Sequence, residues 1–510
     1  MFSRALGISI IGIEGFIISV EVDVSDGLPM FDLVGYLGSE VKEARERVRI
    51  SIKNSGFLLQ PKRITVNLSP ADLRKEGTGF DLSIALGILS AFGYVPNESL
   101  LDTILIGELS LNGEIRGVNG VLPMVYTAYK KGFKRCIVPY DNVKEGAVVT
   151  GIDVYGVKNL KEAVDFINND NLLEPFYYNE EEECLKEDDE YDYSEVSGQP
   201  FAKRAIEVAT AGMHNILLVG TPGSGKTMLA RRIPTIIPEL TLNESLEISK
   251  IYSVSGLLNN NKSIIRTRPF RSPHHTITSQ ALTGGGRIAS PGEISLAHLG
   301  ILFLDELPEF NRNTIEILRQ PLEENKITIA RVNGTTIYPA DIMLVTAMNP
   351  CPCGFYPDRN KCNCTISQVK RYLSKISRPL LDRIDICVET MTVNYEELKN
   401  KKVEESSLDI RTRVLAARKI QLERYDKEGI YYNSQLTPKL IEKYCVLKSK
   451  EEELLKQAFV KYNLSARAYH RILKVSRTIA DLEESEDINV KHISEAIYYR
   501  SIDKKYWGEE

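Results

Sequence analysis

The chain lacks any long apolar run of the kind that spans a membrane. Its most apolar N-terminal stretch, Ile8 to Val20, is interrupted by Glu14 and is too short to cross a bilayer. It has neither a basic leader nor a small-residue cleavage site. We therefore expect no membrane partner, and the absence of a visible targeting signal favours the cytoplasm.

An excess of positive charge is also missing. The chain has 64 Lys and Arg against 69 Asp and Glu, a net charge of -5. This balance gives no global attraction to nucleic acid, so any DNA binding must come from local basic patches or a lined pore. With 43% hydrophobic and 26% charged residues, wholesale disorder and a fibrous repeat are disfavoured. A length of 510 residues predicts about three domains.

The order of strand-like and helix-like patterns divides the chain. Residues 1–170 alternate β-branched runs with helical patterns, which predicts a mixed α/β domain. Residues 171–194 carry an acidic run that we interpret as a solvated linker, with a partner-docking tail as the alternative. In residues 195–394, strands at 301–304 and 342–347 alternate with helices, which predicts a parallel sheet with helices on both faces. Residues 395–510 have long helical patterns and predict a helical lid.

One glycine-rich segment has the pattern of a phosphate-binding loop. It follows the apolar run at 216–219 and matches G-x-x-x-x-G-K-[ST]. Its glycines let backbone N–H groups turn toward phosphates; Lys226 is expected to reach the β and γ phosphates of ATP, and Thr227 to hold Mg²⁺. The predicted nucleotide-binding residues are Gly220, Thr221, Pro222, Gly223, Ser224, Gly225, Lys226, Thr227 and Asp305.

Further polar residues are candidates to act on the γ-phosphate. Asp305 and Glu306 follow a strand-like run, at the end where open α/β sheets place ligands. We expect Asp305 to hold Mg²⁺ through water and Glu306 to polarise the attacking water. Alone, this acid pair would more simply cap a helix. Asn349 ends another strand and is placed to orient the water, and Arg383 and Arg467 offer the positive charge that phosphoryl transfer needs.

Several strings resemble those of a known family, the Mg-chelatase-like AAA+ ATPases of the YifB/ComM type, nearly end to end. They include YSEVSGQPFAKRAIEVATAGMHNILLVGTPGSGKT, FRSPHHT, PGEISLAHLGILFLDELPEF, NPCPCGFYPD and RPLLDRIDICVE. By this resemblance Asn349 corresponds to sensor 1, Arg383 to an arginine finger supplied to a neighbouring subunit, and Arg467 to sensor 2. A finger acting in trans implies a ring, expected to be a homo-hexamer. The resemblance also implies a DNA helicase or branch-migration factor acting in recombination and competence.

The N-terminal segment resembles the Lon-type protease domain that also occurs in RadA. The string KEGTGFD places Gly79 where the protease serine belongs, and NGVLPM places Leu122 where its lysine belongs. Without nucleophile or base the dyad cannot operate, so we expect no protease activity. Ser83 is interpreted as a helix residue. The domain is expected to be a scaffold or a DNA-binding platform.

Four clustered cysteines predict a metal site. Cys136, Cys184, Cys387 and Cys445 are scattered, whereas Cys351, Cys353, Cys362 and Cys364 fall within positions 351–364. In a cytosolic chain such a group predicts metal ligands before disulfides, and four thiolates suffice for structural Zn²⁺. The one-residue spacing inside each pair is tighter than the common two to four, and reduced surface thiols are the alternative. His274 and His275 are better interpreted as a polar loop contact.

Three segments are candidates for a role in DNA binding. A basic stripe on the helix predicted at 40–53 comprises Lys42, Arg45, Arg49 and Lys53, with a solvated mixed-charge face as the alternative. Two β-prone runs around Asn333 and Gly334 predict a hairpin that offers Lys326 and Arg331. By resemblance to related helicases this hairpin projects into a central pore, and the loop from Phe270 to Arg287 is the second pore insertion. Both could equally be subunit-packing elements.

The sequence leaves two functions open. We prefer a DNA-stimulated ATPase that moves or remodels branched DNA, because the RadA-like domain and the cysteine group favour it. The alternative is an ATPase that remodels a protein or a metallocofactor without nucleic acid, which the acidic net charge mildly favours.

Overall fold

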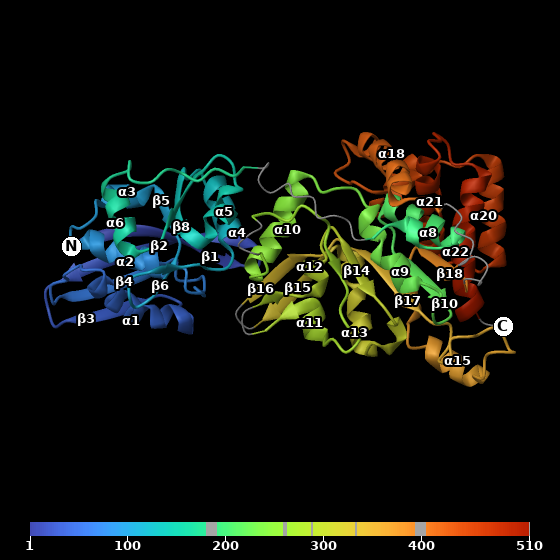
Figure 1. The fold of residues 1–510 in the computed structure, drawn as a ribbon, viewed down its shortest axis with the longest axis horizontal. Coiled ribbons are helices and arrows are strands. Elements are labelled where there is room, and N and C mark those ends of the chain that lie inside the picture. Colours follow the sequence, from blue (N-terminus) through green and yellow to red (C-terminus); the bar gives the residue numbers. More distant parts are fainter. Residues whose placement is uncertain (180–190, 259–262, 287–288, 332–333, 393–403, 509–510) are drawn as a thin grey trace.

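The computed structural model describes residues 1–179, 191–258, 263–286, 289–331, 334–392 and 404–508. Figure 1 shows an elongated molecule, with the N-terminal strands and helices at one end, a second sheet in the middle and the C-terminal helices at the other end. Within the described residues, no helix is both long and apolar enough to cross a membrane.

A seven-stranded sheet organises the N-terminal part, in the order β3-β4-β2-β1-β5-β8-β9. β1 and β2 form a long antiparallel hairpin, β4 joins β2 antiparallel, and the other neighbours are parallel. The strands are β1 (Phe2–Ile11), β2 (Glu14–Ser25), β3 (Met30–Val34), β4 (Arg63–Ser69), β5 (Thr103–Leu105), β8 (Arg135–Pro139) and β9 (Asp153–Val157). The helices include α1 (Ser39–Asn54), α2 (Asp81–Ala91), α3 (Asn97–Leu101), α4 (Val121–Lys130), α5 (Val143–Ala147) and α6 (Leu160–Asn168).

Residue patterns explain these elements. In β4 the residues Ile64, Val66 and Leu68 enter the core while those between them are partly exposed, as a strand with one buried face requires. Beyond Asp81, the sequence of α2 contains no charged residue, and the helix packs against β1 and β2 with nearly all its residues buried. A mixed α/β fold in this part is confirmed.

A five-stranded parallel sheet forms the middle of the molecule, in the order β11-β14-β17-β10-β18. β10 (Ile216–Gly220), β14 (Ile301–Leu304) and β17 (Met343–Met348) are completely buried, which explains their continuous apolar sequences. β11 (Phe270–Arg271) and β18 (Ile386–Thr390) are the edges. The strand predicted at 342–347 corresponds to β17, which begins and ends one residue later.

Helices cover both faces of this central sheet. Ile216 and Leu218 of β10 enter one hydrophobic core, and Leu217 and Val219 enter another on the opposite face. The surrounding helices include α8 (Pro200–Gly212), α9 (Lys226–Arg231), α10 (Leu242–Val254), α11 (Ser279–Thr283), α12 (Glu293–Leu296), α13 (Arg312–Glu316), α14 (Pro321–Glu324), α15 (Ile366–Leu373) and α16 (Arg378–Leu381). β15 (Lys326–Arg331) and β16 (Gly334–Pro339) form the predicted antiparallel hairpin, whose turn residues 332–333 lie outside the described residues.

The C-terminal part is helical, as predicted. It comprises α18 (Ser407–Tyr425), α19 (Pro438–Tyr444), α20 (Ser449–Lys461), α21 (Ala466–Leu482) and α22 (Val490–Trp507). The long helical pattern at 451–482 is broken at Asn463, whose φ is +44°, and a new helix begins where Ser465 accepts a hydrogen bond from the N–H of Ala468 at 3.2 Å.

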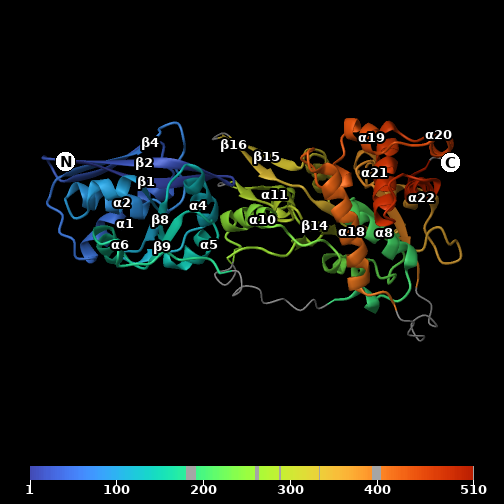
Figure 2. The ribbon, with the colours of Figure 1, turned by 90° about the horizontal axis from the view of Figure 1, so that it is seen from above.

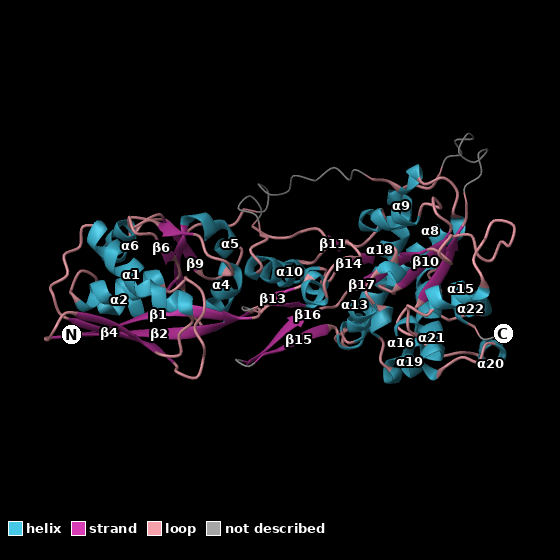
Figure 3. Ribbon diagram, turned by 90° about the horizontal axis from the view of Figure 1, so that it is seen from below, coloured by secondary structure: helices cyan, strands magenta, loops and turns pink. Residues whose placement is uncertain are grey.

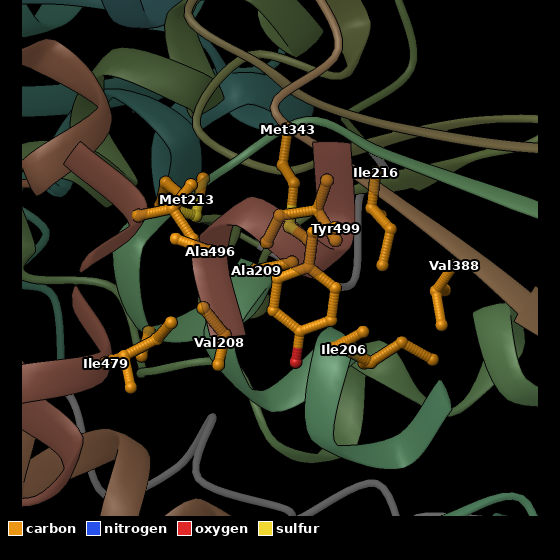
Figure 4. Packing of buried hydrophobic residues seen from close by; sticks show 14 of the residues in the cluster. Ile206, Val208, Ala209, Met213, Ile216, Met343, Val388, Ile479, Ala496 and Tyr499 are labelled. Atoms are coloured by element: carbon orange, nitrogen blue, oxygen red, sulfur yellow. The ribbon is translucent and has the colours of Figure 1, made fainter. Parts of the chain in front are cut away.

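One core joins these helices to the sheet. Ile206 and Ala209 of α8, Ile216 and Met343 of the sheet, and Tyr499 of α22 belong to the same buried cluster (Figure 4). Because helices and sheet share this core, the C-terminal helices are anchored to the side of β10 that carries Ile216.

The N-terminal part meets the middle of the molecule through α4 and α10, which lie side by side (Figures 2 and 3). The N–H of Gly120 donates to the carbonyl of Ser253 at 3.1 Å, and the Ser253 hydroxyl donates to the half-buried Glu145 carboxylate. A second contact joins the β1–β2 turn to the hairpin, because a Cβ on Gly12 would lie 2.9 Å from Cγ2 of Thr336.

Candidate functional site

The loop between β10 and α9 is the centre of the site. Gly223 (φ +75°) and Gly225 (φ +82°) have left-handed backbone conformations that favour glycine. Gly220 leaves no room for a side chain, because a Cβ there would overlap Oγ1 of Thr390 on the neighbouring strand β18. The glycine pattern in the sequence thus has a local structural cause.

Lys226, the first residue of α9, is turned back into this loop. Its Nζ donates to the carbonyl oxygens of Gly220 at 2.9 Å and Thr221 at 2.8 Å, and to Oδ1 of Asn349 at 3.1 Å. Burial lowers the pKa of Lys226, and the nearby carboxylates of Asp305 and Glu306 oppose that shift. A buried cation therefore lies at the point where the loop closes.

Thr227 and Asp305 form a second polar pair beside the loop. The Thr227 hydroxyl donates to Oδ2 of Asp305 at 2.6 Å, and Oδ1 of Asp305 accepts the N–H of Glu306 at 2.9 Å. A hydroxyl and a carboxylate in contact are the hard oxygen ligands that Mg²⁺ prefers.

Glu306 has an unusual backbone for a non-glycine residue, with φ +52°. Its side chain is 58% exposed, and Oε2 lies 3.8 Å from Nδ1 of His275. The rings of His274 and His275 lie 4.0 Å apart, and His274 Nδ1 lies 3.0 Å from Oγ1 of Thr276. The two histidines thus make polar contacts within their loop and with Glu306.

Sheet topology explains why these residues meet. β14, β17 and β10 are adjacent parallel strands, so their carboxyl ends share one edge of the sheet. The strand ends bring together Lys226, Thr227, Asp305, Glu306 and Asn349, which were predicted as parts of one site. This edge offers a buried cation, a hydroxyl, an amide and two carboxylates, the groups that bind a metal-bound polyphosphate.

The two predicted arginines lie elsewhere. Arg383 comes just before β18, whose first residue, Ile386, pairs with the first residue of β10, so it lies at the amino edge of the sheet. Its buried guanidinium donates to Glu323 at 2.5 Å and to the carbonyl of Arg319 at 3.0 Å. Arg467, which is exposed, lies 3.3 Å from the same Glu323 carboxylate. The structure therefore places both arginines together, and away from Lys226 of the same chain.

Two residues that the sequence patterns did not reveal hold the loop. Thr390 Oγ1 lies 2.7 Å from the Ser224 hydroxyl. The side chain of Gln199, whose φ is +63°, accepts the N–H of Met391 at 3.0 Å and donates to the Met391 carbonyl. Both are far from the loop in sequence. Gln199 belongs to one of the strings that carry the family resemblance, but Thr390 had no local signal.

The four clustered cysteines converge in space. Sγ of Cys351 lies 3.4 Å from that of Cys353 and 3.7 Å from that of Cys362, and all four sulfur atoms, including that of Cys364, lie within 4.8 Å of one another. A tetrahedral Zn²⁺ with Zn–S bonds of about 2.3 Å would place its sulfur atoms about 3.8 Å apart. The N–H of Tyr356 donates to Sγ of Cys351 at 3.4 Å. The residues therefore fit a tetrathiolate metal centre.

The remaining cysteines are not part of this group. Cys136, Cys387 and Cys445 are buried singly and unbonded to one another, and burial raises the pKa of Cys387 and of Cys445 to about 12. Cys184 lies outside the described residues, as do Asn333 and Arg287.

The candidate DNA contacts are exposed. Lys42, Arg45, Arg49 and Lys53 all lie on the outer face of α1, but Glu46 pairs with Arg45 at 3.5 Å and with Arg49 at 2.8 Å. Lys326 and Arg331 are exposed at the two ends of β15. Glu46 therefore offsets part of the positive charge of the α1 stripe.

The positions that correspond to the Lon serine and lysine, Gly79 and Leu122, carry neither a nucleophile nor a base. The Leu122 side chain is completely buried, and its backbone N–H donates to Glu145 at 2.9 Å. Ser83 is buried within α2 and donates its hydroxyl to the Phe80 carbonyl at 2.9 Å, the helical role that was expected. Gly79 precedes this helix.

Known proteins match this chain over nearly its full length. "Subunit ChlI of Mg-chelatase" matches residues 20–142, "Magnesium chelatase, subunit ChlI" matches 192–398, and its C-terminal family matches 404–500. The chain is 42% identical to competence protein ComM of Haemophilus influenzae, over 98% of this chain and 97% of that protein. It is also 42% identical to YifB of Escherichia coli, over 97% and 96%.

The N-terminal part has two further partial similarities. It is 28% identical to Lon protease 2 of Bacillus subtilis over 144 residues, which are 27% of this chain and 25% of that protein. It is 34% identical to DNA repair protein RadA of Halalkalibacterium halodurans over 116 residues, 22% and 24% of the two chains. The resemblances seen in the sequence are thereby confirmed.

Proposed function

The chain belongs to the Mg-chelatase-like AAA+ family that includes ComM and YifB, and from this premise we propose that it is an ATP-hydrolysing motor acting on DNA. The single observation that carries the proposal is the convergence of Lys226, Thr227, Asp305 and Asn349 at the carboxyl edge of the central sheet. Such a site binds a nucleoside triphosphate with its metal ion.

Each residue of the site has a proposed role in hydrolysis. Lys226 exchanges its contacts with Gly220, Thr221 and Asn349 for oxygens of the β and γ phosphates. Thr227 and Asp305 hold Mg²⁺, which when bound neutralises charge on those phosphates. Glu306 takes the proton of the attacking water, and Asn349 orients that water once Lys226 has released it.

The arginines are proposed to act on a neighbouring subunit. Arg383 and Arg467 lie together at the amino edge of the sheet, so neither is beside its own phosphate loop. A closed ring, which we propose to be a homo-hexamer, brings this edge of one subunit to the carboxyl edge of the next. Glu323 pairs with both arginines in the isolated chain and would have to release them to the γ-phosphate.

DNA is the proposed partner. The relative from Haemophilus influenzae is named a competence protein, and part of the N-terminal region resembles a DNA repair protein. The exposed Lys326 and Arg331 on the hairpin, together with the stripe on α1, supply local positive charge on an acidic chain. We propose that the protein moves branched DNA by helicase or branch-migration activity.

The cysteine group is proposed to hold one structural Zn²⁺. Its four sulfur atoms have the spacing of a closed tetrahedral site, and the loop that bears them contains no helix or strand. Zinc here would fix a loop and take no part in hydrolysis.

An ATPase assay of the purified full chain with and without single-stranded DNA tests the proposal. We expect ATP turnover that rises when DNA is added. Turnover that DNA leaves unchanged, at salt low enough to permit phosphate contacts, would favour the alternative of a protein- or metallocofactor-remodelling ATPase. No turnover under either condition would refute the motor itself.

A further inference from the structure

The cysteine loop and the phosphate loop touch, although about 130 residues separate them in sequence. Gly354, which follows Cys353, has φ +86° and packs against the ring of Pro222. A Cβ on Gly354 would overlap Cδ of Pro222 and lie 2.6 Å from its Cγ. Carbon atoms in contact are about 3.5–4.0 Å apart, so even one added methyl group would displace one loop or the other.

A second connection runs along the chain. Cys351 follows Asn349 by two residues, and Asn349 ends β17 and accepts a hydrogen bond from Lys226 at 3.1 Å. The cysteine loop is thus tied to the phosphate loop at two points, one through Asn349 and one through Gly354.

The loop itself has little regular structure to hold it in place. Residues 349–365, all of which the structure describes, form neither helix nor strand. The N–H of Gly354 donates to the carbonyl of Cys351 at 3.0 Å, and the N–H of Cys362 donates to the carbonyl of Asp358 at 2.8 Å. Loops of this length without helix or strand are uncommon in compact domains and mostly serve a function. A metal ion bound by the four thiolates would fix the residues on both sides of Gly354.

We propose that the metal centre of the cysteine loop controls nucleotide affinity, by positioning the phosphate loop through the contact between Gly354 and Pro222. This inference rests on the proposed ATP and zinc sites and adds a coupling between them. Metal binding raises the affinity for nucleotide, and by linkage nucleotide raises the affinity for metal by the same factor.

The variant Gly354→Ala tests the contact while it keeps all four cysteines. We expect the full-length variant to retain one zinc per chain by elemental analysis but to bind a fluorescent ATP analogue about tenfold more weakly, the effect of overpacking a tight contact. Gly429→Ala is the matched control, because Gly429 also has a positive φ (+69°) but has no atom within 4 Å of its added Cβ. That control should bind the analogue as the unmodified chain does.

A double-mutant cycle separates this contact from general damage. Replacing Pro222 by Ala removes the atoms that the new methyl group would strike, so Pro222→Ala should recover part of the affinity lost in Gly354→Ala. The coupling would be overturned if the losses of nucleotide affinity in the two single variants simply add in the double variant. It would also be overturned if Gly354→Ala keeps both its zinc and its full affinity for the ATP analogue.

Metal removal gives an independent measurement should Gly354→Ala lose its zinc. Stripping zinc from the unmodified chain with a chelator should lower its affinity for the analogue, and added Zn²⁺ should restore it. Equal affinity of the metal-free and zinc-loaded chains overturns the inference alone. A chain purified without zinc, or one that binds no nucleotide, refutes the proposed sites as well.

Discussion

Individual side chains at the carboxyl edge of the central sheet determine what the site can do. Lys226 is held by Gly220, Thr221 and Asn349, and its burial lowers the pKa of its amine. Glu306, by contrast, has a mostly exposed side chain, and its backbone N–H donates to Oδ1 of Asp305. Replacing Lys226 therefore removes part of the proposed phosphate-binding site, whereas replacing the Glu306 side chain leaves the contacts of Lys226 intact.

This difference predicts opposite results for two variants. Lys226→Ala should abolish nucleotide binding or turnover, while Glu306→Gln should bind ATP normally and turn it over about 10²–10³-fold more slowly. Nucleotide affinity and steady-state turnover measured on the same preparations check this. Unchanged turnover in Glu306→Gln would remove Glu306 from the catalytic role.

Local sequence patterns singled out residues that the structure places side by side. Lys226, Thr227 and Asp305 were predicted to share a site because a glycine-rich loop and an acidic strand end have recognisable spacings. Thr390 was missed because its contact with Ser224 depends on which strand pairs with β10. The meeting of Arg383 and Arg467 at Glu323 was likewise invisible, since it depends on how α21 packs against the sheet.

At the scale of elements, the cysteine loop is a segment that a bound metal ion would stabilise, because residues 349–365 form neither helix nor strand. Replacing Cys351 and Cys364 together by Ser should release the zinc that we expect at one per chain, and should unfold the loop locally, because metal-binding energy is folding energy there. Elemental analysis and limited proteolysis at residues 351–364 measure the two effects. Cys445→Ser is the control, since Cys445 is buried away from the group. Absence of stoichiometric zinc in the unmodified chain would contradict the assignment.

The basic stripe on α1 makes a separate prediction. Replacing Lys42, Arg45 and Arg49 by Ala should weaken binding to single-stranded DNA and flatten its salt dependence, by about 0.7 in slope for each phosphate that is no longer neutralised. Replacing Lys450, Lys456 and Lys461, exposed on α20, removes the same charge from another surface and serves as the control. If both variants respond alike in a salt titration, the α1 stripe is a solvated face paired with Glu46, and Lys326 and Arg331 become the next candidates.

The sequence predicted well the helices and strands whose apolar residues recur with a clear spacing. The helix predicted at 40–53 is α1, and the strand predicted at 301–304 is β14. The hairpin of β1 and β2 was missed, because its apolar run gave no sign that the chain turns at Gly12, where φ is +67°.

At the scale of the whole molecule, the N-terminal part is docked on the centre where α4 packs against α10. Glu145 accepts hydrogen bonds from Leu122 and Ser253 across the junction of α4 with α10, and burial raises its pKa. The sequence did not predict this junction, because its partners lie more than 100 residues apart. The divisions at residues 171–194 and near 395 stay predictions, since residues 180–190 and 393–403 are not described.

Removing residues 1–170 tests what this part does. We expect the shortened chain to bind ATP through its own loop, but to bind DNA more weakly or to assemble less readily into rings. The full chain should show no peptidase activity with or without ATP, because Gly79 and Leu122 supply neither nucleophile nor base. Loss of ATP binding after the deletion would instead make the N-terminal part a structural requirement of the nucleotide site.

Each ATP site is proposed to be shared between two subunits of a ring, and mixing two inactive variants tests this proposal most directly. Arg383→Ala supplies an intact Glu306 and Glu306→Gln supplies an intact Arg383, so equal mixing should leave about a quarter of the interfaces complete. We predict that ATP turnover reappears in mixed rings, although neither variant alone is active. No recovery at any ratio, with mixed rings shown to form, would contradict the shared site.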